Sequence, residues 1–238
     1  MWLFCVLAFL DAICFEAFMT NTPIIYQQKF NMGIQQAGLI LAIPCATIII
    51  LAPFLTIAFE RCGKRCFYLM LGFIFVLASH LIFYSKSNCT QREPCPSSTI
   101  PLGLLGLGSA MIKLTLLPSL GLVTKERFYG PAFGMFIIFI NLGVLFGSVI
   151  IGSVVDESSQ PPNKYGDLHL VLACFSTVGL MVSTYICAND EIKHGRLNAV
   201  TYMEHIQVTP YESEDEPSEA ENKDEVRSFG DLDIKHTK

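Results

Sequence analysis

Six long apolar stretches constrain the fold of this sequence more than any other feature. An α-helix rises about 1.5 Å per residue and the hydrocarbon core of a bilayer is about 30 Å thick, so about 20 consecutive apolar residues are needed to cross it. Six stretches meet that requirement, and they run approximately over Trp2–Met19, Gly33–Phe59, Cys66–Tyr84, Thr99–Val123, Pro131–Val155 and Leu168–Cys187. The sequence therefore predicts an all-α membrane protein whose residues 1–188 form a six-helix transmembrane bundle in a lipid bilayer.

The charged residues are concentrated beyond the last apolar stretch. Of the 238 residues, 52% are hydrophobic and 16% are charged, which is too apolar for an ordinary soluble domain. The net charge of −5 comes mainly from acidic side chains in residues 207–238, a region with few bulky aliphatic residues. We therefore expect residues 189–238 to form a disordered acidic cytoplasmic tail. The sequence has no basic stripe, which argues against a nucleic-acid partner.

The first apolar stretch has two interpretations. Its position at the N-terminus and its apolar character are those of a secretory signal. It lacks a basic N-terminal region, however, and Asp11 lies in its middle, which favours a helix that stays in the membrane.

Lysine and arginine residues near the helix ends predict the orientation of the bundle. The side with more of these residues is expected to be cytoplasmic, and it holds Arg61, Lys64, Arg65, Lys125, Arg127, Lys193 and Arg196. The opposite side holds fewer, namely Lys29, Lys86, Arg92 and Lys164. Both termini are therefore expected in the cytoplasm.

The loop Asn88–Pro96 lies on the side opposite the cytoplasm in this prediction. Its sequence Asn88-Cys89-Thr90 is an N-glycosylation sequon, so we expect a glycoprotein. Cys89 and Cys95 lie close enough in the sequence for a short disulfide if the loop faces an oxidising compartment. The other cysteines lie mostly in apolar runs, and we expect no metal site among them.

The segment Thr56–Arg65 carries a recognisable loop motif. It reads TIAFERCGKR, which resembles the G-x-x-x-D-R-x-G-R-R loop between the second and third helices of each half of the major facilitator superfamily. Thr56 stands in place of the first glycine of that motif, and Glu60 in place of the aspartate. The resemblance implies a gating loop formed by Glu60, Arg61, Gly63, Lys64 and Arg65. The alternative is a basic turn that only fixes the orientation.

A second set of residues narrows the resemblance within that superfamily. It is similar to the tenth and eleventh helices of the branch that includes a lysosomal dipeptide transporter, and it consists of Ser109-Ala110, Pro118, Gly130–Gly134, Asn141–Gly143 and Gly152–Asp156. The resemblance covers about residues 1–188 and assigns the six stretches to helices seven to twelve, the C-terminal half of the family fold. It implies a lysosomal or related membrane, and a second six-helix half or another copy of the chain as partner.

Small residues in the fourth and fifth stretches predict close helix packing. Gly103, Gly106 and Gly108 lie in the fourth stretch, while Gly130, Gly134, Gly143 and Gly147 give two GxxxG spacings in and around the fifth. In lipid, helices associate through close backbone approach at such residues. We therefore expect these glycines to serve as packing surface.

Three charged residues inside the apolar stretches are the strongest chemical clues. Asp11 and Glu16 lie in the first stretch and Lys113 in the fourth, where an ionisable side chain needs water or a partner. The resemblance places these stretches around a central cavity, in which Lys113 would bind the carboxylate of a zwitterionic solute such as a dipeptide and an acid would bind its amino group. The alternative is a structural ion pair without substrate contact. Asn141, in the fifth stretch, is expected either to bond a neighbouring helix or to contact the solute.

Two functions remain open from the sequence. The first is a secondary transporter, or half of one, that moves short peptides by alternating access. The second is a non-transporting membrane subunit or scaffold that pairs with another transporter half. We expect no enzyme and no cofactor, since the sequence has no HExxH motif and no evident Ser/His/Asp set.

Overall fold

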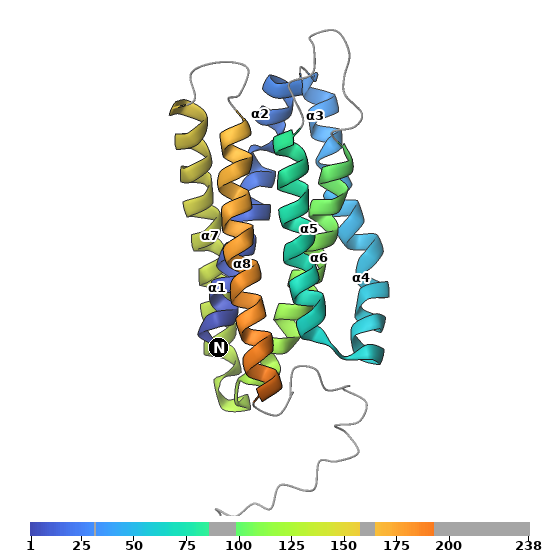
Figure 1. Cartoon of the computed structure of the whole chain (residues 1–238), viewed down its shortest axis with the longest axis vertical. Coiled ribbons are helices and arrows are strands. Elements are labelled where there is room, and N and C mark those ends of the chain that lie inside the picture. Colours follow the sequence, from blue (N-terminus) through green and yellow to red (C-terminus); the bar gives the residue numbers. More distant parts are fainter. Residues whose placement is uncertain (31, 86–98, 158–164, 193–238) are drawn as a thin grey trace, which may run out of the picture. The chain divides into compact units, whose positions relative to one another are not determined.

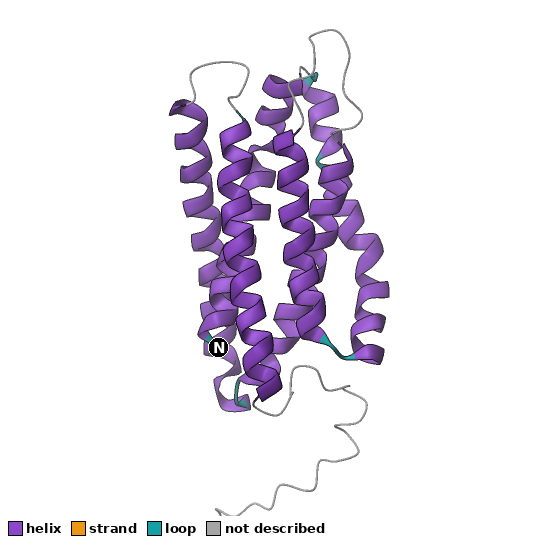
Figure 2. Ribbon diagram, viewed as in Figure 1, coloured by secondary structure: helices purple, strands orange, loops and turns teal. Residues whose placement is uncertain are grey.

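The computed structural model describes residues 1–30, 32–85, 99–157 and 165–192, and within these ranges the chain is helical apart from short turns (Figures 1 and 2). The helices in chain order are α1 (Trp2–Asp11), the π-helix η1 (Ala12–Ala17), α2 (Phe18–Phe30), α3 (Ile34–Ile40), α4 (Ala42–Cys62), α5 (Arg65–Ser85), α6 (Thr99–Val123), the short 3₁₀-helix η3 (Glu126–Phe128), α7 (Tyr129–Glu157) and α8 (Gly166–Ile192).

Six rods in the described residues are long and apolar enough to cross a membrane. They are Trp2–Phe30, Ile34–Phe59, Arg65–Ser85, Thr99–Val123, Tyr129–Val155 and Gly166–Asp190. The first consists of α1, η1 and α2 joined end to end, and the second of α3 and α4. The prediction of an all-α six-helix transmembrane bundle is therefore confirmed. The predicted tail begins within α8, which continues to Ile192, and residues beyond 192 lie outside the described part of the chain.

The first rod is longer than the sequence predicts. The apolar stretch ends at Met19, but the helix continues to Phe30 through Thr20, Asn21 and Thr22. These side chains return to the helix itself: Thr20 Oγ1 and Asn21 Nδ2 each donate to the carbonyl of Ala17 at 2.8 Å. Thr22 Oγ1 donates to the Phe18 carbonyl at 2.8 Å. Because their polar groups are satisfied locally, these residues extend a helix that hydropathy alone would end.

The first and fourth rods form the centre of the bundle. Within their most apolar windows 72% of Trp2–Phe30 and 61% of Thr99–Val123 is buried, against 6% of Ile34–Phe59. The first and fourth rods are therefore the most enclosed of the six. In Figure 1 the remaining helices stand alongside this centre, with the N-terminus and the end of α8 at the same end of the bundle.

Glycine contacts hold several of these helices close together. A Cβ atom added to Gly143 of α7 would lie 2.5 Å from the Phe9 carbonyl oxygen of α1, and one added to Gly147 would lie 2.5 Å from the Cβ of Ala17. Gly72 of α5 and Gly108 of α6 face each other, and each lies against the other's carbonyl oxygen. The packing role predicted for the glycines is confirmed at Gly108, Gly143 and Gly147, and at Gly106, which meets Pro44. Around Gly103, Gly130 and Gly134 the space is open, so these glycines make no close contact within the described chain.

The turn between α4 and α5 is tight and backbone-specific. Gly63 ends α4 with φ 61 and ψ −120, a conformation that favours glycine, and its N–H donates to the Phe59 carbonyl at 3.0 Å. Lys64 follows with φ 45. Two residues therefore join α4 to α5 and reverse the direction of the chain.

Candidate functional site

The π-helix η1 places two acidic residues on one face of the first rod. Asp11 ends α1 and Glu16 lies within η1, five residues later. In an α-helix, with about 3.6 residues per turn, residues five apart point in well-separated directions. A π-helix joins residues five apart by hydrogen bonds, so it brings such residues close to the same face. Both acids consequently point toward α6.

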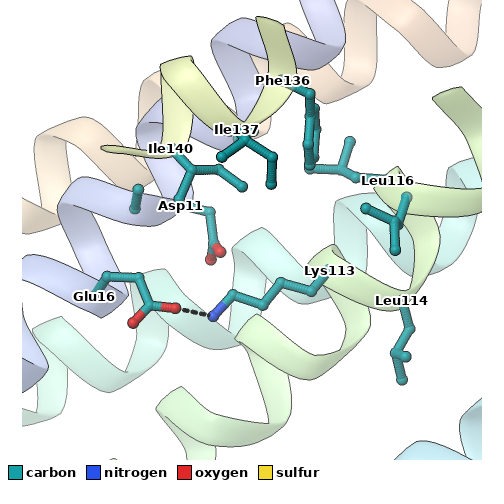
Figure 3. A pocket seen from close by; sticks show the side chains of 11 residues that line it. Asp11, Glu16, Lys113, Leu114, Leu116, Phe136, Ile137 and Ile140 are labelled. Atoms are coloured by element: carbon teal, nitrogen blue, oxygen red, sulfur yellow. Dashed lines mark hydrogen bonds and ion pairs between the residues drawn. The ribbon is translucent and has the colours of Figure 1, made fainter. Parts of the chain in front are cut away.

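Lys113 of α6 meets these acids near the middle of both helices. Its Nζ donates to Glu16 Oε1 in an ion pair, shown by the dashed line in Figure 3. The same ammonium group lies 4.3 Å from the centroid of the Phe15 ring, in cation–π geometry. More than a third of each charged side chain stays accessible, 37% for Lys113 and 40% for Glu16, so the pair faces an open space rather than packed core. The depth of Lys113 in α6 prevents its ammonium from reaching the membrane surface.

Asp11 lies beside this pair in a different environment. Only 3% of the residue is exposed, and its Oδ2 accepts a hydrogen bond from Ser109 Oγ of α6 at 3.4 Å. Its Oδ1 has no hydrogen-bond partner among the described residues. A buried carboxylate with a free acceptor is costly unless something completes its bonding. The site therefore offers an acceptor for a donor that the described residues do not supply.

A cavity of ≈340 Å³ connects these groups. It is bounded by α1, η1, α6 and α7, and its lining consists of Ala8, Asp11, Ala12, Glu16, Lys113, Leu114, Leu116, Leu117, Phe136, Ile137 and Ile140. Figure 3 shows the three charged side chains converging on this space, with Phe136, Ile137 and Ile140 of α7 on another side. An apolar pocket with a few convergent polar groups is the usual form of a small-molecule site.

Asn141 does not line this cavity. Its side chain is exposed on α7, and its Nδ2 donates to the Ile137 carbonyl of the same helix at 2.9 Å. The structure brings together three of the four predicted cavity residues, namely Asp11, Glu16 and Lys113.

The predicted gating loop lies at the end of the bundle, away from the cavity. Gly63 and Lys64 form the turn already described, Arg61 is exposed and Arg65 is buried at the start of α5. Asn88, Cys89 and Cys95 lie outside the described residues. Among the described residues no group of three metal-ligating side chains is present.

Sequence reasoning missed the π-helix and the role of Phe15. The five-residue spacing of Asp11 and Glu16 within an apolar stretch is the one signal that could have indicated η1, because two buried acids are expected to share one polar face. Ser109 entered the sequence analysis only as part of a family motif, and the structure adds its contact with Asp11.

The six membrane-length helices of the described residues, three of which bound a charged cavity, define an integral multi-pass membrane protein. The comparison with known families agrees with this class. The chain belongs to the Major Facilitator Superfamily, whose sequence model matches residues 4–198. Membership of this family supports the expectation that the chain is not an enzyme.

The individual relatives found within this family share less than a quarter of their residues with the chain over the matched region. The chain is 23% identical over 156 residues to the lysosomal dipeptide transporter MFSD1 of Bos taurus, which covers 66% of this chain and 32% of the bovine protein. It is 23% identical over 198 residues to the protein of the same name from Danio rerio, covering 83% of this chain and 40% of the fish protein. The chain thus spans about a third to two fifths of the length of these relatives.

Proposed function

We propose that this chain forms one half of a secondary transporter that moves small zwitterionic solutes, in particular short peptides, by alternating access. The observation that carries the proposal is the cavity itself: one cation and two carboxylates converge on an apolar space of ≈340 Å³ near the middle of the membrane-spanning helices. Transporters of this kind bind their substrates near the bilayer midplane, between two halves.

In this proposal, different charged residues bind the two ends of the solute. The Lys113 ammonium, seated over Phe15, would hold the solute carboxylate after exchanging it for Glu16. Asp11, whose Oδ1 has no partner among the described residues, would accept hydrogen bonds from the solute amino group. The apolar side chains Phe136, Ile137 and Ile140 would contact the side chains of a dipeptide. A neutral solute would leave the Lys113–Glu16 pair intact and gain little.

Partner and location belong to the same proposal. The partner is a second six-helix half, in the same longer protein or in another chain, since the relatives are two to three times as long as the matched region. The distant similarity to lysosomal dipeptide transporters supports a lysosomal or related membrane, and the excess of lysine and arginine at one end supports cytoplasmic termini.

The test is binding and flux of a dipeptide by the purified chain in liposomes, alone and with a candidate N-terminal half, under a pH gradient. Lys113→Ala should weaken binding about 10- to 100-fold, because a hydrogen bond to a charged group contributes about 1.5–3 kcal/mol. Lys125→Ala, at an exposed lysine beyond the end of α6, is the matched control and should bind like the unchanged chain. Folded protein that neither binds nor moves dipeptide in either preparation would instead support the non-transporting subunit.

A further inference from the structure

A second pair of titratable side chains lies outside the cavity. His80 of α5 and His169 of α8 are both 0% exposed, and their ring centroids are 5.8 Å apart. His80 lies five residues before the end of α5, and His169 is in the first turn of α8. Figure 1 shows these two helix ends at the same end of the bundle, opposite the N-terminus.

Aromatic rings enclose this histidine pair. The Phe18 ring of α2 meets both imidazoles edge-on, at 5.6 Å from His80 and 5.5 Å from His169. Phe83 stacks on His169 with centroids 4.7 Å apart and an angle of 9°. The pair therefore lies in a closed, largely apolar environment, in which neutral rings pack well and a charged ring is poorly solvated.

The ring nitrogens of the pair are poorly satisfied. His80 Nε2 lies 3.3 Å from the Cys14 carbonyl oxygen, while His80 Nδ1 and both nitrogens of His169 have no hydrogen-bond partner in the described part of the chain. A neutral imidazole always carries one N–H donor, and leaving such a donor unpaired in a protein interior costs about 1–3 kcal/mol. Packing alone would be served better by phenylalanine, so the cost indicates a use for the imidazoles in another conformer.

The charged neighbour of the pair would oppose a proton in this conformer. This neighbour is Lys29 of α2, whose Nζ donates at 3.1 Å to the carbonyl of Phe83, the residue whose ring stacks on His169. The uncharged titratable groups nearby are the Cys14 thiol of η1, Tyr26 of α2, whose ring contacts Phe83, and Tyr165, which precedes α8 and bonds Gln28. From α6 comes the Pro101 carbonyl, an acceptor for Ser79 at 2.7 Å. Asp167, the nearest acid along α8, is exposed on another face of that helix. None of the hydrogen bonds or ring contacts of the pair in the described residues involves a carboxylate.

We propose that His80 and His169 form a proton-binding site, and that protonation opens this end of the bundle. An imidazolium here would face the Lys29 ammonium without a counter-ion, so the charged pair requires a conformer in which water reaches it. Protons bind that open conformer better and therefore shift the population toward it. Protonation of His80 would also affect the cavity, because His80 contacts the Cys14 carbonyl of η1, two residues before Glu16.

The test does not depend on transport, so it can fail or succeed separately from the proposed function. The full chain, labelled with ¹⁵N-histidine, is placed in lipid nanodiscs and its imidazole resonances are followed from about pH 7.5 to about pH 5, the range in which histidine normally titrates. Hydrogen–deuterium exchange of the adjoining ends of α5 and α8 is measured at both extremes and corrected for the intrinsic effect of pH. The three other histidines of the sequence, at positions 194, 205 and 236, provide reference resonances.

Two variants separate protonation from packing. His169→Phe keeps a ring against Phe83, and His80→Gln keeps a donor near the Cys14 carbonyl. In the unchanged chain both resonances should reach the protonated form, with exchange about tenfold faster at low pH, as for a sub-global opening. The double variant should lose that acceleration. The proposal would be overturned if the two imidazoles stay neutral down to about pH 5, or if exchange accelerates equally in the double variant. If the variants do not fold, the titration of the unchanged chain is the deciding measurement.

Discussion

Replacing Gly143 by alanine tests the contact that holds α7 against the first rod. The added methyl group would lie 2.5 Å from the Phe9 carbonyl oxygen, 2.8 Å from the Ala12 Cβ and 3.2 Å from the Phe9 Cα. These neighbours are backbone atoms or the Cβ of an alanine, so no side-chain rotation can make room. Gly134 lies on the same helix, and an alanine Cβ there would meet nothing within 4 Å. Gly134→Ala is therefore the matched control.

The expected difference follows from two opposing effects. Alanine is a better helix former than glycine by about 1 kcal/mol, and this gain is shared by both variants. Carbon atoms pack best at about 3.5–4.0 Å, so at Gly143 α7 must move outward by about 1 Å. Overpacking of this kind costs about 1–3 kcal/mol. The free energy of unfolding of Gly143→Ala should thus fall below that of Gly134→Ala by about 1–3 kcal/mol.

The assay is reversible unfolding in mixed detergent micelles, followed by far-ultraviolet circular dichroism. Because Ala12 begins η1, the displacement should also loosen the Lys113–Glu16 pair and weaken dipeptide binding in the Gly143 variant only. Equal stability of the two variants would refute the reasoning, since it would mean that α7 does not approach α1 as closely as described.

Three further predictions concern the charged site, the turn and the thiols. Asp11→Asn preserves the shape of the residue but removes its charge, so binding of a dipeptide should weaken more than binding of the same peptide with a blocked amino group; an equal loss would place the amino group elsewhere. Gly63→Ala forces a side chain into a backbone conformation that costs about 1–3 kcal/mol, measurable as a lower free energy of unfolding, whereas an unchanged value would mean that the turn relaxes freely. A water-soluble maleimide should label Cys62, which is exposed at the end of α4, and should spare the buried Cys14, as mass spectrometry of peptides would show; labelling of Cys14 would contradict its burial.

The fold could be predicted from the sequence because the membrane limits the alternatives. Hydropathy alone located the span Thr99–Val123 at both ends, since its boundaries coincide with changes in polarity. It failed at Met19, where the following polar residues bond to their own helix and so cost little to include. A hydropathy pattern reports side-chain polarity, and it cannot report how a side chain satisfies its own hydrogen bonds.

The candidate site could be predicted only in part, for a related reason. A charge in an apolar stretch needs a partner, which identified Asp11, Glu16 and Lys113. Which acid binds Lys113 depends on the register between helices that are 97 residues apart in sequence and on the extra residue of η1. His169 escaped notice because a single histidine near a helix start has no distinctive pattern, and its relation to His80 exists only once α5 and α8 are packed.

The mutual contact of Gly72 and Gly108 has a mechanical consequence. With backbone against backbone and no intervening side chain, α5 and α6 cannot slide past each other without a collision between main chains. We therefore expect α5 and α6 to move together in any rearrangement of the bundle. His80 lies on one of these two helices and Lys113 on the other, so the proposed proton site and the proposed solute site would be carried by the same pair of helices.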